Sequence, residues 1–303
     1  MVFNDCQCTV GEPVSCSGVG MHSGKRVKMT IHPAPVNHGI KFLRRDLPDN
    51  PCVAAHFNLV VDTSLATVIG NDGFIVSTIE HLMASFAGLG VDNALVELNA
   101  YEVPIMDGSA QTFTDLIKRA GIRRQPGNKY CFIITKPIEL SRDEKFVAVY
   151  PDWEPRISYT IDFDHPMIGR QSLSVALTNG AFENEICWAR TFGFLNEIEY
   201  LKKYGFAKGG SLDNVVVVDA QTVMNADGLR SPDEFVRHKI LDCIGDFSLL
   251  GMPIIGHIKI SKSGHAFNHA FLREFFARKD AWHTALSHEL LQQLRPPLKN
   301  LAI

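Results

Sequence analysis

Hydrophobic and polar residues alternate along parts of this chain with the two-residue period of a half-buried strand. Residues 27–31 show the pattern clearly, because polar side chains separate Val27, Met29 and Ile31. Alternation of this kind directs every second side chain to one face of a sheet. This pattern, together with short apolar runs, predicts strands at 27–31, 40–44, 94–98, 130–135, 146–150, 157–163, 215–218 and 254–260.

Other segments carry the start and stop signals of helices. Ser231 precedes Pro232, which suits a first helical position, and Glu234 follows in the expected first turn. Ser77 and Glu80 have the spacing of a capping box, which predicts a second helix start. Helices are therefore predicted from 77 to 88 or 90, and at 112–120, 231–250 and 266–277.

A polar stretch with Pro-Gly at its centre, residues 123–128, divides the chain into two parts. Its composition favours a linker, and each part mixes strands with about two helices. We therefore predict an α+β fold of two similar domains, 1–126 and 127–303, each a layered sandwich of sheet and helices. A length of 303 residues suits one large domain or two ordinary ones.

Composition excludes several classes of protein. The hydrophobic fraction of 46% and the charged fraction of 21% are those of a soluble globular protein. A net charge of −3 argues against a general nucleic-acid binder. The seven cysteines form no CxxC pair, which favours a reducing compartment. Without a signal-peptide pattern, a membrane-length apolar segment or a coiled-coil seam, we expect a cytoplasmic monomer with no stable membrane insertion.

The predicted helix 231–250 carries a polar stripe on a largely apolar surface. His238 and Asp242 are four residues apart and so share a face, and Glu234 and Asp246 extend the stripe by one turn each way. Burying an imidazole and a carboxylate is costly unless something satisfies both. A metal ion would do so, and a hydrogen bond between the two side chains explains the spacing about equally well.

The predicted helix that starts at Ser77 carries the adjacent pair Glu80-His81 among apolar neighbours. If the two helices meet, His81, His238 and Asp242 supply the ligand set of a hydrolytic zinc site with an open position. Glu80 would then be placed to take a proton from water. Taken alone, the pair also fits a capping glutamate beside a core histidine.

Two glycine-containing segments each hold a further histidine. Residues 17–24 are not interpreted as a dinucleotide loop, because such a loop opens a helix and residues 25–32 have a strand pattern. A hairpin turn with a structural His22 is expected there. Residues 261–265 follow a strand and precede a helix, where backbone amides can hold an anion. His265 fits an acid at that place or an exposed loop histidine.

Motifs in order along nearly the whole chain together resemble the UDP-3-O-acyl-N-acetylglucosamine deacetylases, zinc amidases of lipid A biosynthesis in Gram-negative bacteria. As a set the motifs are highly specific. They are HSG at 22–24, TIEHL at 78–82, VPIMDGS at 103–109, ARTFGF at 189–194, DGLR at 227–230, FVRHK at 235–239, DxxGD at 242–246 and KSGH at 262–265.

The resemblance implies an active site between two sandwich domains and assigns roles to individual residues. It implies one Zn²⁺ ion, or Fe²⁺ in the cell, with the ligands His81, His238 and Asp242. It also implies Glu80 as general base and His265 as its protonated partner. Asp246 would orient His265, and Thr191 would help to hold the oxyanion. Either His265 or Glu80 would protonate the leaving amine.

The resemblance also implies how an acylated UDP-amino sugar is bound. Lys239 and Lys262 would lie near its polar or diphosphate end, and Phe163 near the uracil. Phe194 and Ile198 would line the passage for the acyl chain. The chain departs from the family in two places: Trp188 replaces an arginine, and the variable segment 63–67 supports no expected contact with the substrate.

Two other classes explain less of the sequence. A non-haem iron oxygenase also uses two histidines and one carboxylate, but this chain has no His-x-Asp or His-x-Glu pair. A non-catalytic module that binds nucleotide sugars leaves the polar stripe on an apolar helix unexplained.

Overall fold

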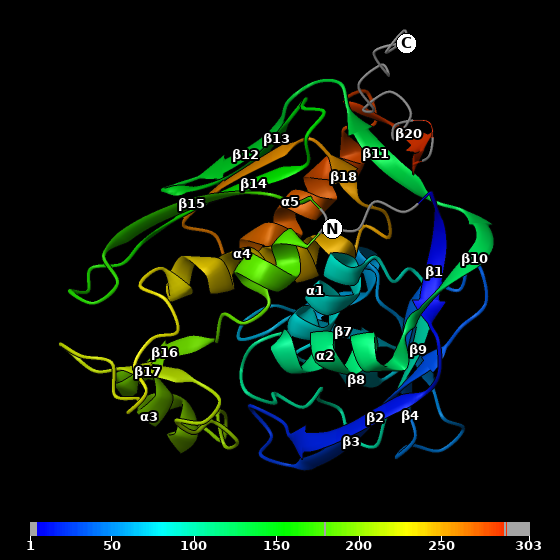
Figure 1. The fold of residues 1–303 in the computed structure, drawn as a ribbon. Helices are drawn as coiled ribbons and strands as arrows, with labels where there is room; N and C mark the ends of the chain where they lie inside the picture. Colours follow the sequence, from blue (N-terminus) through cyan, green and yellow to red (C-terminus); the bar gives the residue numbers. More distant parts are fainter. Residues whose placement is uncertain (1–4, 179, 288, 290–303) are drawn as a thin grey trace, which may run out of the picture.

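The computed structural model describes residues 5–178, 180–287 and 289. Two sheets form the outer layers, and the main helices lie between them (Figure 1). The first sheet has the order β2 (Val14–Val19), β3 (Arg26–Pro33), β9 (Ala94–Leu98), β4 (Ile40–Arg44) and β5 (Cys52–Ala54). The second has the order β12 (Ile138–Arg142), β13 (Lys145–Tyr150), β19 (His257–Ser261), β14 (Arg156–Asp162) and β15 (Arg170–Ala176).

The two sheets share one topology. In each, four strands follow one another along the chain and a later strand inserts between the second and the third. β9 is antiparallel to β3 and parallel to β4, and β19 is antiparallel to β13 and parallel to β14. This repeat confirms the α+β prediction of two similar sandwich domains.

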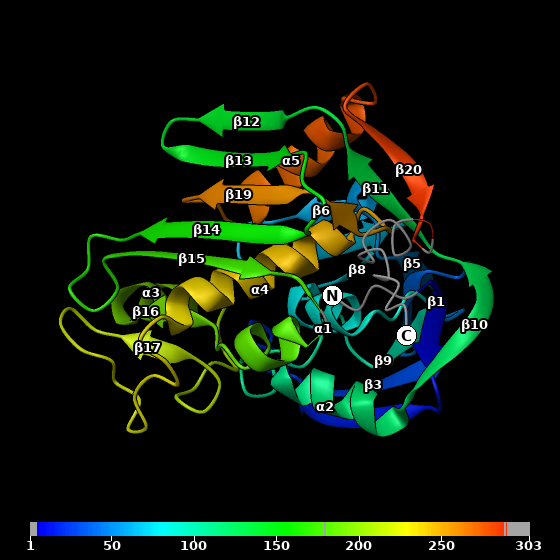
Figure 2. The same cartoon turned by 45° about the horizontal axis from the view of Figure 1, so that its top comes forward.

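Corresponding helices cover the inner faces of the two sheets. In the first half these are α1 (Glu80–Leu89) and α2 (Gln111–Ala120), and in the second α4 (Glu234–Ser248) and α5 (His265–Ala277). α1 packs against α4 along much of its length, and every residue of α1 except Ala87 is buried. Figure 2 shows the inner helices between the sheets. The helices therefore join the two halves.

Each half carries an insertion between its fourth strand and its first main helix. In the first half the insertion includes the turn η1 (Phe57–Leu59) and a small sheet of β6 (Val60–Asp62), β7 (Val68–Asn71) and β8 (Phe74–Val76). In the second it includes the short π-helix η2 (Phe182–Ile186), β16 (Phe192–Phe194), α3 (Leu195–Lys203) and β17 (Val216–Val218). β16 and β17 pair in parallel.

The predicted linker 123–128 is a strand. β10 (Ile122–Asn128) pairs antiparallel with β1 (Cys6–Val10) because β1 offers it a free edge, and its polar side chains remain largely exposed. The chain then enters β11 (Tyr130–Ile134), which lies between β18 (Ile254–Ile255) and β20 (Trp282–Leu286). A polar, turn-like composition was therefore misleading about local structure at this junction.

Three further predictions need correction. The predicted strand 254–260 is two strands, because the chain passes at Gly256 from the sheet of β11 to the sheet of β13. α4 begins at Glu234, so Pro232 precedes the helix. α1 begins at Glu80 with Ile79 as its N-cap, so Ser77 lies before the helix and does not cap it. The Ser77 amide donates to Tyr101 O. The strands at 40–44 and 94–98 match their predictions.

Within the described residues, no helix has both the length and the apolar character needed to cross a bilayer.

α1 and α4 make a close backbone contact at Gly245. A Cβ atom there would lie 2.1 Å from the Glu80 carbonyl oxygen. Helix propensity alone predicts that Gly245→Ala stabilises the protein by about 1 kcal/mol. We expect the opposite, a loss of about 1–3 kcal/mol, because the two helices must separate. Thermal unfolding measures the sign, and a raised Tm would contradict the predicted clash.

Candidate active site

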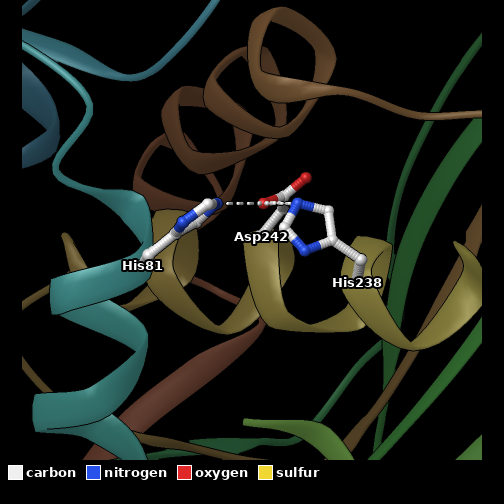
Figure 3. A group of neighbouring side chains, drawn as sticks. All are labelled: His81, His238 and Asp242. Carbon is white, nitrogen blue, oxygen red and sulfur yellow. Dashed lines mark ion pairs between the residues drawn. The ribbon is translucent and has the colours of Figure 1, made fainter. Parts of the chain in front are cut away.

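Three potential metal ligands meet where α1 packs on α4. His81 comes from α1, and His238 and Asp242 come from α4 (Figure 3). Asp242 Oδ1 lies 3.2 Å from His238 Nε2 and 3.5 Å from His81 Nε2. All three residues are buried. The structure thus brings together the two stretches of sequence whose meeting the ligand prediction required.

The cluster fits a tetrahedral cation. Ligand atoms about 2.0–2.1 Å from a common zinc ion are about 3.3 Å apart at tetrahedral angles, close to the distances from Asp242 Oδ1 to the two Nε2 atoms. Asp242 Oδ1 is buried and has no hydrogen-bond partner among the described residues. His238 Nδ1 lies 3.0 Å from the carbonyl oxygen of Ala189. A proton held there leaves His238 Nε2 free to bind a metal.

The protonation states of the cluster also suit a metal. Burial lowers the pKa of His238 more than nearby Asp242 raises it, so the imidazole is neutral near pH 7. Burial acts to raise the pKa of Asp242, but His238 and Lys239 outweigh it and hold this pKa well below the usual range. Lys239 Nζ donates to Asp242 Oδ2 at 2.8 Å. A neutral imidazole and an ionised carboxylate are the forms that bind metals.

Glu80 begins α1 beside the cluster and is only 4% exposed. Its Oε2 accepts a hydrogen bond from the Thr67 amide at 3.0 Å. Burial raises the pKa of Glu80 to about 7, and the charges of Asp242 and Asp246 add to this effect while His265 opposes it. The Thr67 amide thus holds a carboxylate that can exchange a proton near neutral pH.

His265 is the first residue of α5 and faces Glu80. Its Nε2 lies 3.8 Å from Glu80 Oε1, and its Nδ1 lies 2.9 Å from Asp246 Oδ2. Burial acts to lower the pKa of His265, but Asp246 and Glu80 outweigh it and raise this pKa to about 10. The imidazolium is thus kept charged at neutral pH beside a carboxylate of shifted pKa, a pattern typical of paired acid and base groups.

Asp246 holds His265 as part of a wider network. Besides His265 Nδ1, its carboxylate accepts from Asn268 Nδ2 at 2.8 Å and from Thr67 Oγ1 at 2.5 Å. Neither donor was predicted from the sequence. Asn268 lies three residues after His265 on α5, so helical spacing could have found it. Thr67 gave no such signal, because it is 179 residues from Asp246 in the chain.

A cavity of about 610 Å³ opens onto these groups from both halves of the molecule. Thr191, Ile198 and Lys239 are among the residues that line it. His22, expected to be structural, lies in the confirmed hairpin turn between β2 and β3 and also lines the cavity. Apolar residues make up much of the wall, including Met21, Leu65, Ile105, Leu195, Leu201, Val215, Val217 and Met224.

Three predicted substrate contacts lie outside this lining: Phe163, Phe194 and Lys262. Phe163 packs against the rings of Phe192 and Phe194, with ring centres 5.8 Å apart in both pairs. Lys262 pairs with Asp162 at 3.0 Å and with Glu144 at 3.1 Å. A separate cavity of about 240 Å³ contacts other parts of α1 and α4 but none of the clustered groups.

Thr191 is held in place by its neighbours in the chain. Glu234, in the first turn of α4, accepts from the backbone and the guanidinium of buried Arg190. The carbonyl of Ala189 lies against His238, and the Thr191 amide donates to the carbonyl of Gly108 at 2.8 Å. The segment 189–191 thus connects the candidate metal ligands to the cavity wall.

An open cluster of two histidines and a carboxylate, with a glutamate and a cationic histidine beside it in a partly apolar cavity, defines the class of metal-dependent hydrolases. The chain belongs to the UDP-3-O-acyl N-acetylglycosamine deacetylase family, whose model matches residues 7–277. This membership confirms the resemblance found in the sequence.

Relatives named UDP-3-O-acyl-N-acetylglucosamine deacetylase support the assignment over most of their length. The protein of Myxococcus xanthus is 52% identical over 268 residues, which cover 88% of this chain and 85% of the relative. That of Teredinibacter turnerae is 49% identical over 278 residues, covering 91% and 92%. That of Syntrophus aciditrophicus is 45% identical over 279 residues, covering 92% and 89%.

The geometry predicts that His238→Ala weakens metal binding without unfolding the protein. Removing one of three ligands leaves an incomplete site, whereas the helix tolerates alanine. We expect metal content, measured by atomic emission after dialysis, to fall from about one ion per chain to a small fraction of that. His257→Ala, on β19 and bonded to Ser158 instead, is the matched control. Full metal retention in His238→Ala would contradict the assignment.

Proposed function

We propose that this chain hydrolyses the N-acetyl group of UDP-3-O-acyl-N-acetylglucosamine to acetate and the free amine, with one zinc ion held by His81, His238 and Asp242. The reaction is that of its family in lipid A biosynthesis. The observation that carries the proposal is the placement of Glu80 and His265 beside the ligand cluster in the shared cavity. Bound there, zinc would polarise the amide carbonyl and acidify water.

The donor set supports zinc as the metal. Two imidazoles and one carboxylate are typical of hydrolytic zinc sites with an open position. Fe²⁺ accepts the same donor types, so the metal used in the cell is a separate prediction, which metal analysis of the protein purified from its source would test.

Glu80 is proposed as the general base that takes a proton from the attacking water. Its Oε2 is fixed by the Thr67 amide, which leaves Oε1 as the oxygen nearer to His265. A base whose pKa lies near the working pH combines enough of the ionised form with enough basicity. The burial that raises the pKa of Glu80 to about 7 provides this match.

His265 and Thr191 are proposed to stabilise the negative charge that develops on the amide oxygen. A fixed cation and a fixed hydroxyl lose less energy in reorganising than water does, so they stabilise the transition state more than the ground state. Asp246 keeps His265 charged and binds its Nδ1, so that Nε2 of the ring is on the side of Glu80. The amine leaves with a proton from either His265 or Glu80, both of which face the cavity.

The remaining substrate contacts are proposed from the chemistry of the lining. Ile198 stands among the apolar residues of the cavity wall, which suits an acyl chain. Phe194, the last residue of β16 and directly before α3, is assigned to the same passage. Phe163 is assigned to the uracil because an aromatic ring can stack on a base. Lys239 and Lys262 are assigned to the diphosphate. The cytoplasmic location and the monomeric state stay predictions from the sequence.

Glu80→Gln tests the base directly. The amide keeps the size of the side chain but cannot accept a proton, and general-base catalysis typically contributes about 10²–10⁴-fold. We expect full zinc content and a kcat reduced by at least about 10²-fold, measured as acetate release. Glu139→Gln, a carboxylate on β12 that pairs with Tyr150, should keep its rate. A Glu80→Gln enzyme with a normal rate would remove Glu80 from the mechanism.

His265→Ala tests the cationic partner in the same assay. Loss of one donor to a developing oxyanion costs about 10²–10³-fold in kcat, whereas zinc should stay bound because His265 is not a ligand. The matched control is His269→Ala, one turn further along α5, whose Nε2 lies 2.9 Å from Phe57 O, outside the site. Equal activity of the two variants would count against the proposed role of His265.

A further inference from the structure

Thr67 lies where the two halves of the molecule meet at the candidate active site. It ends the segment 63–67 between β6 and β7 and is only 2% exposed. The residues that it contacts come from three helices, α1, α4 and α5. No other residue of the first half among those described has its side chain hydrogen-bonded to Asp246.

The hydroxyl group of Thr67 completes the network around His265. Oγ1 donates to Asp246 Oδ1 at 2.5 Å and lies 3.3 Å from His265 Nδ1. A hydroxyl has one proton to donate, and the short contact assigns that proton to the carboxylate. Asp246 Oδ2 is therefore left to accept from His265 and Asn268. The threonine fixes the rotation of the carboxylate and, through it, the plane of the imidazole.

The backbone of Thr67 acts on the other reacting group. Its amide donates to Glu80 Oε2 at 3.0 Å, so Oε1 is the carboxylate oxygen that faces His265 Nε2 at 3.8 Å. Thr67 thus hydrogen-bonds to Glu80 through its amide and to Asp246 through its hydroxyl. Its hydroxyl also lies beside His265, which Asp246 holds. Glu80 belongs to the first half, whereas Asp246 and His265 belong to the second.

We propose that Thr67 is a positioning residue that sets the placement of His265 relative to Glu80 across the two halves. This inference rests on the proposed function, because it assumes that these two side chains carry out the proton transfers. Reaction rates depend steeply on such placement, and an error of about 1 Å can cost about 10²-fold.

The test compares two substitutions in the zinc-loaded enzyme. Thr67→Val keeps the shape and the amide but removes the hydroxyl, whereas Thr67→Ser keeps the hydroxyl. We expect Thr67→Val to keep its zinc and its KM within about 2-fold while kcat falls about 10–100-fold. Thr67→Ser should stay within about 3-fold of the parent kcat. Thr114→Val removes another buried hydroxyl, on α2, and should leave kcat unchanged.

Three outcomes would overturn the proposal: an unchanged kcat in Thr67→Val, an equal loss in Thr67→Ser, or a loss explained by missing zinc. If Thr67→Val does not fold, Thr67→Ala removes the same hydroxyl without risk of a clash, and the same limits apply to it.

A second measurement separates this inference from the proposed function. Thr67→Val keeps the hydrogen bond from the backbone amide of residue 67 to Glu80. The effect of the substitution on kcat should therefore pass through His265. In a His265→Ala background, Thr67→Val should therefore reduce kcat by no more than about 2-fold, because coupled residues are not additive. A full further loss would overturn the positioning role. If His265→Ala is itself fully active, the role of His265 in the proposed function fails, whatever the coupling between the two residues.

Discussion

The close crossing of α1 and α4 is the constraint on which the site depends. At Gly245 the backbones approach so closely that a single added carbon would overlap the carbonyl of Glu80. Because a glycine permits this approach, His81 on one helix reaches His238 and Asp242 on the other. The helices occupy equivalent positions in the two sandwich halves, so the packing that joins the halves also assembles the ligands.

That packing places ionisable groups where their solvation is poor. Glu80, Asp242 and Asp246 are all buried. Among the described residues, Lys239 donates to Asp242, and cationic His265 pairs with Asp246 and Glu80. Buried charges of this kind usually cost stability unless each finds partners. A divalent cation would balance the excess of negative charge at the cluster. The buried carboxylates that cost stability without a metal would therefore favour metal binding.

The repeat of the fold explains why the cavity lies between the halves. Both halves insert extra elements at the same point, between the fourth strand of the sheet and the first main helix. Residues 63–65 of the first insertion and residues 191–224 of the second contribute to the lining. The common scaffold supplies the rigid helices with their charged groups. The two different insertions supply most of the apolar wall and, through Thr67, the alignment of the reacting side chains.

Local pattern alone determined the regular strands at 40–44 and 94–98, the polar stripe of α4 and, through its motifs, the family. These features depend on side-chain periodicity and residue identity, which a sequence displays directly. Tertiary structure decided that the two helices meet, that residues 122–128 pair as a strand, that Glu80 accepts a hydrogen bond from Thr67, and how His265 is aligned. Such contacts join residues far apart in the chain, and their geometry is fixed by packing rather than by local preference.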